Sequence, residues 1–114
     1  MSSTVGEVAR EAGVSTHTVR FYEQHGLLAA VRTPGNQRRF EADTACRIKV
    51  ARVAQRIGLT VAEIRAVLDT LPPAPTADDW QRFQDALAAE AELRVGELRT
   101  VLADIRSEQK LCAL

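Results

Sequence analysis

Aromatic residues are scarce in this 114-residue sequence, which contains three Phe, one Tyr and one Trp. Its core therefore has to be built from Val, Leu, Ile and Ala, and such a composition favours helices over a β-sandwich. Two cysteines, Cys46 and Cys112, are too few for a disulfide framework and indicate a reducing compartment. The sequence also lacks an apolar run of the roughly 18 residues that span a bilayer, and it does not start like a signal peptide. We expect a cytoplasmic protein with no membrane partner.

The net charge is zero, but the charges are unevenly distributed. Residues 1–58 contain nine bases and five acids, whereas residues 59–114 contain six bases and ten acids. A basic half joined to an acidic half indicates that one end of the protein meets a polyanion and the other does not. The alternative is a chance distribution of surface charge, and only the motifs can decide between the two.

Two short helices joined by a tight corner are predicted in the first 26 residues. Thr4 and Glu7 have the spacing of a capping box, and apolar residues then recur at helical spacing up to Gly13, which favours a left-handed helix end. Ser15 should cap a second helix, which ends at His25. The pattern predicts a helix-turn-helix, a motif of DNA-binding proteins that also occurs as a plain helical corner.

A β-hairpin is predicted directly after the second helix. Residues 31–40 have the pattern of two short strands around a Pro-Gly-Asn turn. The hairpin carries three arginines and almost no apolar side chains, so we expect it to be exposed and to follow a DNA backbone as a wing. Phe40, at its end, should anchor the hairpin in the core.

A pair of helices and a proline-rich segment are predicted next. Asp43 should cap the first helix and Gly58 should end it. Its apolar face is expected to consist of Cys46, Val50, Val53 and Ile57. Thr60 and Glu63 form a second capping-box pattern, which opens a helix to Leu71. The prolines within residues 72–77 then predict a stiff linker.

A helix of about 30 residues, from residue 76 or 78 to about residue 110, is the last predicted element. Its apolar residues form one narrow seam, which consists of Trp80, Phe83, Leu87, Ala91, Val95, Leu98, Leu102 and Ile105. Such a helix pairs either with the same helix of a second molecule or with its own domain, and we favour a homodimer. The expected domains are a DNA-binding domain over 1–71, a linker over 72–77, and a coiled-coil dimerisation helix with a short tail over 78–114.

With these motifs in place, the sequence resembles the MerR family of bacterial transcription regulators. The resemblance is carried by VGEVAREAGVS at 5–15, TVRFYEQHGLL at 18–28 and GNQRRF at 35–40. It implies a mainly α, winged helix-turn-helix protein that binds double-stranded promoter DNA as a homodimer, distorts it for RNA polymerase, and is not an enzyme. The alternatives are an effector-independent repressor or architectural DNA-binding protein, and a protein–protein adaptor that uses the acidic long helix.

The resemblance also implies which residues meet DNA. They are Ser15, Thr16, His17, Thr18, Arg20, Tyr22, Arg32, Asn36, Arg38 and Arg39. Arg20 is expected near the base edges, where it bonds a guanine, or else contacts a phosphate or Glu23. Tyr22 either contacts phosphate through a free hydroxyl or lies half-buried in the core. One of the two adjacent wing arginines should reach phosphate, while the other braces the wing.

Within the family, GNQRRF and AQRIGL at 54–59 are most similar to the SoxR branch, which senses redox stress through an iron–sulfur cluster. That branch has four closely spaced cysteines just beyond the long helix, whereas this sequence has only Cys112 there. One thiolate per subunit cannot supply four ligands, so we expect no cluster, no metal site and no other cofactor. Either the sensor is absent or changed, or the natural chain continues.

The two cysteines are expected to differ from each other. Cys46 should behave as a small hydrophobe on the apolar face of its helix. Cys112 is near an exposed end and is either a redox-reactive thiol that could join two subunits or an inert tail thiol.

Overall fold

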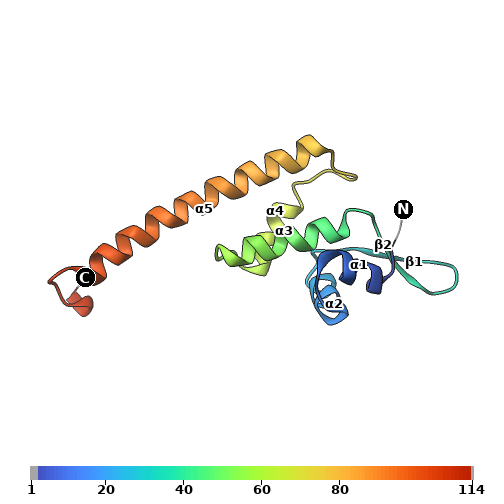
Figure 1. The fold of residues 1–114 in the computed structure, drawn as a ribbon, viewed down its shortest axis with the longest axis horizontal. Coiled ribbons are helices and arrows are strands. Elements are labelled where there is room, and N and C mark those ends of the chain that lie inside the picture. Colours follow the sequence, from blue (N-terminus) through green and yellow to red (C-terminus); the bar gives the residue numbers. More distant parts are fainter. Residues whose placement is uncertain (1–2, 114) are drawn as a thin grey trace. The chain divides into compact units, whose positions relative to one another are not determined.

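The computed structural model describes residues 3–113, which form five α-helices, one two-stranded antiparallel sheet and a final turn of 3-10 helix (Figure 1). In chain order the elements are α1 (Val5–Ala12), α2 (Thr16–Gln24), β1 (Ala30–Arg32), β2 (Arg38–Phe40), α3 (Thr44–Arg56), α4 (Val61–Leu68), α5 (Ala77–Arg106) and η1 (Leu111–Ala113). The chain divides into two compact units, Met1–Thr76 and Ala77–Leu114. The predicted domains also include Met1, Ser2 and Leu114, which lie outside the described residues. Within residues 3–113, no helix is both long enough and apolar enough to cross a membrane.

The predicted helix-turn-helix is confirmed, and local hydrogen bonds explain its limits. The Thr4 hydroxyl accepts from the Glu7 backbone N–H at 3.2 Å, and the Glu7 carboxylate accepts from the Thr4 N–H at 3.0 Å. Gly13 ends α1 with φ 72°, a left-handed conformation that glycine adopts without strain. Three residues later α2 begins, capped by the Ser15 hydroxyl. Because caps and the glycine fix both helix ends, the corner between α1 and α2 is set by the sequence itself.

The core of the N-terminal unit gathers apolar side chains from every helix of that unit and from the hairpin. Its most deeply buried large side chains are Val8, Val19, Leu27, Phe40, Ile48, Ile64 and Leu68. Phe40 anchors the end of β2, as predicted. Its backbone also exchanges two hydrogen bonds with Ser3, at 2.8 and 2.7 Å. The hairpin is therefore fixed at its base, while its turn extends from the unit (Figure 1).

The hairpin pairs Ala30 with Phe40, Val31 with Arg39 and Arg32 with Arg38. Its turn is closed by a hydrogen bond from the Thr33 N–H to the Gln37 carbonyl at 2.9 Å. Asn36 has φ 60°, a left-handed conformation that asparagine tolerates better than most residues. The predicted wing is confirmed as an element, and its strands are each three residues long.

The predicted apolar face of α3 is wrong. The buried face of this helix consists of Thr44, Ala45, Ile48, Ala51 and Ala54. Cys46 is exposed and Val53 is 46% exposed, whereas Val50 and Ile57 are half-buried. Most side chains of the buried face are small, which lets α3 pack closely against α1. Cys46 is therefore not a core hydrophobe.

One predicted helix cap and one predicted helix limit also differ from the structure. Asp43 stands at the start of α3 but makes no side-chain capping bond, and its carboxylate instead lies 3.9 Å from Arg47. The capping box of Thr60 and Glu63 is present, but α4 ends at Leu68 and not at Leu71. Leu71 lies in a bend directly before the prolines.

The long helix α5 is confirmed, with 30 residues from Ala77 to Arg106. Phe83 is buried within the chain, and its ring packs edge-on to Trp80 with centroids 5.9 Å apart. Toward the C-terminal end of the expected seam, Val95, Leu98, Leu102 and Ile105 are all exposed. The part of the seam left open for a partner is therefore the C-terminal half of α5.

Candidate nucleic-acid interface

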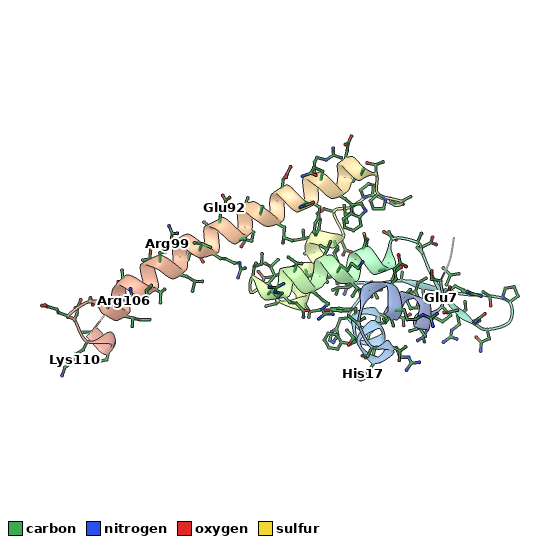
Figure 2. All side chains as sticks on the ribbon, viewed as in Figure 1. Glu7, His17, Glu92, Arg99, Arg106 and Lys110 are labelled. Atoms are coloured by element: carbon green, nitrogen blue, oxygen red, sulfur yellow. The ribbon has the colours of Figure 1, made fainter. Side chains whose placement is uncertain are left out.

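One face of α2 is buried and the other presents polar side chains. Val19 and Tyr22 lie in the core. Thr16, His17 and Arg20 are exposed, and His17 projects away from the other helices of its unit (Figure 2). Among residues 3–113 Arg20 forms no ion pair, so the Glu23 alternative for this arginine is wrong. The exposed face of α2 therefore offers hydrogen-bond donors at the start of the helix and one guanidinium near its middle.

Ser15 and Thr18 are brought together at the start of α2. The Ser15 hydroxyl accepts from the Thr18 backbone N–H at 3.1 Å and lies 3.0 Å from the Thr18 hydroxyl. Ser15 is exposed and Thr18 is half-buried, and each hydroxyl has a partner within the chain. They define where the helix begins and so determine the placement of Thr16 and His17.

Both adjacent wing arginines pair with carboxylates of the helix-turn-helix. Arg38 Nη1 lies 3.2 Å from Glu23 in α2, and Arg39 Nη1 lies 3.7 Å from Glu7 in α1. One of these arginines was expected to reach phosphate and the other to brace the wing. In this structure both side chains brace the wing. Each pair is part-exposed, so a phosphate can compete for the guanidinium.

The tip of the wing is held by a third arginine. Arg32 Nη1 donates to the backbone carbonyl and to the side-chain oxygen of Asn36, both at 3.3 Å. Arg32 and Asn36 are exposed. The hairpin thus carries one arginine near its tip and two near the helices.

The hydroxyl of Tyr22 is not free. Tyr22 is 3% exposed, and its hydroxyl donates to Gln55 Oε1 in α3 at 2.6 Å. Burial raises the pKa of Tyr22 above 10.0, although the nearby Arg52 partly opposes this shift. Of the two alternatives for this residue, the core position is the observed one.

Three exposed residues near α2 were missed by the sequence analysis. Gln55 and Arg52 are exposed on α3, and their place beside Tyr22 depends on tertiary packing. Phe21 is exposed next to Arg20, and its ring lies 4.3 Å from that of His25. The sequence offers one indication of a role for Phe21, which is the presence of an aromatic residue within the motif TVRFYEQHGLL. Together these residues add a donor, a cation and an apolar surface around the exposed face of α2.

Glu7 has a lowered pKa because the backbone N–H of Thr4 donates to its carboxylate, with a further contribution from the Thr4 hydroxyl. Arg39 lowers the same pKa through its charge. The ionised form of Glu7 is therefore favoured, and it both caps α1 and pairs with the wing.

The cysteines of this chain do not fit a four-thiolate iron–sulfur cluster. Cys46 in α3 and Cys112 in η1 are both exposed and belong to different units. Residues 3–113 contain no group of three or more His, Cys, Asp or Glu side chains that could hold a metal ion. A four-thiolate site would need cysteines that this chain does not contain.

Two family profiles match the chain. The profile described as "MerR HTH family regulatory protein" matches residues 3–71, and the profile described as "MerR, DNA binding" matches residues 46–107. Their combined range includes all five helices and the hairpin.

Curated relatives are similar over much of the chain. A protein named HTH-type transcriptional activator SoxR homolog, from Chromobacterium violaceum, is 41% identical over 85 residues, which is 73% of this chain and 57% of that protein. The mercuric resistance operon regulatory protein of Shigella flexneri is 33% identical over 103 residues, which is 90% of this chain and 66% of that protein. The matched parts thus span less than two thirds of the length of these relatives.

A solved structure has a similar fold. It is described as HiNmlR, a MerR family regulator lacking the sensor domain, bound to promoter DNA. It matches with a TM-score of 0.59 and 20% sequence identity, over 92% of this chain and 85% of that one. The fold of the chain, a mainly helical structure with a winged helix-turn-helix and a long last helix, therefore agrees with this structure.

Proposed function

The chain belongs to the MerR family of helix-turn-helix regulatory proteins, and from this premise we propose that it binds promoter DNA as a homodimer and regulates transcription. One observation carries the proposal. The exposed face of α2 and the arginine-bearing wing lie on one unit, and the ion pair of Arg38 with Glu23 joins the wing to the C-terminal end of α2. A helix with an exposed polar face fits the major groove of DNA, and a basic hairpin beside it fits the neighbouring backbone.

We assign base reading to the exposed start of α2. Thr16, His17 and Arg20 present their side chains there, and Arg20 is suited to bidentate bonding of guanine. Phe21 offers an apolar surface that suits the methyl group of thymine. Ser15 and Thr18 act through the helix cap and hold this face in place.

We assign phosphate contacts to the wing and to one end of α3. The wing residues are Arg32, Asn36, Arg38 and Arg39. Beside α2, Arg52 and the side-chain nitrogen of Gln55 take the role that the sequence analysis gave to the Tyr22 hydroxyl. Tyr22 then supports Gln55 from the core. These contacts position the protein without reading sequence.

The dimer is assigned to α5. Residues 1–71 form the DNA-binding domain, residues 72–77 the linker, and residues 78–114 the dimerisation helix and its tail in this proposal. The expected seam is Trp80, Phe83, Leu87, Ala91, Val95, Leu98, Leu102 and Ile105, of which the last four are exposed. An isolated helix of this length with an exposed seam is stabilised by pairing with a second copy.

Two linked reading heads account for an effect on transcription. A dimer that holds two α2 helices in successive major grooves can bend or untwist the DNA between them, at a cost of about 1–6 kcal/mol that further backbone contacts offset. In a promoter, such a distortion changes how RNA polymerase meets its two recognition elements. The activator name of one relative and the promoter DNA in the solved relative support this role. The adaptor alternative accounts for α5 but leaves the exposed start of α2 without a function.

A DNA-binding selection on the purified chain tests the proposal. We expect enrichment of an inverted repeat whose half-sites are separated by about one helical turn or a multiple of it, as a symmetric dimer requires. Transcription from a promoter that carries the selected site, with and without the protein, then gives the sign of regulation. Recovery of random sequences only, with no repeat, would reject sequence-specific regulation.

A further inference from the structure

Helix α3 has a second apolar face besides the one buried in the core. Cys46, Val50, Val53 and Ile57 follow one another at intervals of four, three and four residues, on the side opposite Ile48 and Ala51. Cys46 and Val53 are exposed and the other two are half-buried. We call these four residues the α3 stripe. A row of apolar side chains along three turns of an exposed helix is typical of a contact surface.

A basic row accompanies the α3 stripe. Helix α3 contains four bases and no acid. Arg47 is engaged within its unit, because it donates to the Leu27 carbonyl at 3.1 Å and pairs with Asp43. Arg52 lies toward Tyr22. Lys49 and Arg56 remain, both exposed, seven residues apart and on the same side of the stripe.

Helix α5 carries more exposed apolar surface than a single pairing seam uses. Val101 is exposed but lies to one side of the seam that contains Leu98 and Leu102. Glu97 and Asp104 lie on that same side, also exposed and also seven residues apart. A partner helix on the seam would leave Val101 and the two acids at the edge, free to meet another element. We call Glu97, Val101 and Asp104 the α5 flank.

The two surfaces are complementary in polarity, charge and spacing. The α3 stripe is apolar with two cations beside it, and the α5 flank is apolar with two anions beside it. Seven residues correspond to about 10.5 Å along a helix in both cases, so two ion pairs can form at once. We propose that, in the homodimer, the α5 flank of one copy docks on the α3 stripe of the other. This inference rests on the homodimer of the proposed function and adds a second surface to it.

The docking ties the dimer helix to the domain that reads DNA. Helix α3 packs against α1 and its Gln55 holds Tyr22 in α2, so a contact on the outer side of α3 is one helix away from the reading face. A copy whose α5 is held on the α3 of its partner cannot rotate its domain freely. The distance between the two reading heads is then set by both surfaces together.

Charge reversal tests the docking whether the two helices lie parallel or antiparallel to each other. The dimer dissociation constant is measured by sedimentation equilibrium of the full chain without DNA. Lys49→Glu with Arg56→Glu is expected to raise it about tenfold or more, because four exposed ion pairs per dimer are replaced by repulsion. Adding Glu97→Lys and Asp104→Lys to the same chain reverses both rows and should restore the constant to within about threefold of the wild type. All four residues are exposed, so the fold should persist, and circular dichroism checks it.

A matched pair of valine variants tests the apolar part. Val53→Asp places a charge in the α3 stripe and should raise the dissociation constant about tenfold or more. Val31→Asp makes the same change at a more exposed valine in the wing, 63% against 46%, and should leave the constant unchanged.

The outcomes separate the two proposals. A wild-type chain that sediments as a monomer removes the homodimer and the docking with it. A dimer whose dissociation constant is unaffected by Val53→Asp and by the α3 charge reversal removes the docking alone. Weakening by the α3 variants without rescue by the quadruple variant overturns the pairing with the α5 flank. Weakened DNA binding with an unchanged dimer would show that Lys49 and Arg56 face phosphate, and would likewise overturn the docking.

Discussion

Arg38 in the wing and Glu23 in α2 form an ion pair, with Nη1 and Oε1 3.2 Å apart. The pair joins the hairpin to the helix that we assign to the major groove. Its side chains are 34% and 22% exposed, so it contributes no more than about 1 kcal/mol to stability. Its main effect is to orient the wing before DNA arrives, after which phosphate competes with the carboxylate for Arg38.

Removal of the wing arginines should weaken binding to every DNA sequence. Arg38→Ala with Arg39→Ala removes two cations per subunit and four per dimer, so the plot of log binding constant against log salt should become shallower by about 2 to 4. Fluorescence anisotropy at several salt concentrations measures the slope. Arg99→Ala with Arg106→Ala, at two exposed arginines of α5 (Figure 2), is the matched control and should keep the wild-type slope. A wild-type slope for the wing variant would show that the wing does not contact phosphate.

Arg20 should set part of the sequence preference. Arg20→Ala is expected to relax the preference at one base pair of each half-site and to cost about 1–3 kcal/mol per half-site on the selected sequence, with little loss on random DNA. Arg10→Ala, an exposed arginine of α1, should leave the preference as it is. The measurement is a binding selection followed by sequencing. If both variants select the wild-type site, Arg20 does not read bases.

Tyr22 should ionise only at high pH. It is the one tyrosine of the chain, so the ultraviolet absorbance of phenolate reports this residue alone. Burial raises its pKa above 10.0 in the folded protein, and the neutral form is therefore the stable one. This contribution to stability is complete below the unfolded pKa of about 10 and is lost as the pH rises through the folded pKa. A titration midpoint at or below 10.0 in the folded chain would contradict the burial of the hydroxyl.

The exposed end of the seam should hold the dimer together. Leu98→Asp introduces an unpaired charge there and should convert the dimer to monomers, as seen by light scattering, with far weaker DNA binding because the two heads lose their mutual effective concentration. Leu93→Asp is the control: it changes another exposed leucine of α5, 58% against 66%, that lies away from the seam. A chain that stays dimeric with Leu98→Asp would place the dimer contact elsewhere.

The 114-residue chain should not hold an iron–sulfur cluster. A protein purified without oxygen is expected to be colourless and to contain no stoichiometric iron or sulfide, because Cys46 and Cys112 are its only thiols. Elemental analysis and the visible spectrum check this. A charge-transfer band with stoichiometric iron would overturn the prediction, and Cys112→Ser would then test whether that thiol is a ligand.

The local features of the fold could be predicted from sequence because neighbouring residues determine them. The capping boxes at Thr4 and Thr60 satisfy backbone groups three residues away, and Gly13 needs no distant partner to adopt its left-handed conformation. The wing likewise follows from its turn residues. The predicted type of each of these elements is correct, and the predicted limits differ from the observed ones by a few residues at most.

Features that depend on packing could not be predicted in the same way. Helix α3 has two apolar faces, and periodicity alone favours the one with the larger side chains, Val50, Val53 and Ile57. The core instead uses the face rich in alanine, because α1 approaches closely there. The bond between Tyr22 and Gln55 joins residues 33 positions apart, and no local pattern indicates it. The ion pairs of Arg38 with Glu23 and of Arg39 with Glu7 likewise join residues that are distant in the sequence, and no local pattern indicates them.

The division of the chain into two units also separates its chromophores. Tyr22 lies in Met1–Thr76 and Trp80, the one tryptophan, lies in Ala77–Leu114, within the first turn of α5. Each unit therefore carries its own intrinsic optical reporter. Selective excitation of the indole follows α5, while the near-ultraviolet dichroism of the buried phenol follows the DNA-binding unit. An unlabelled sample can thus show whether the two units melt together or in sequence.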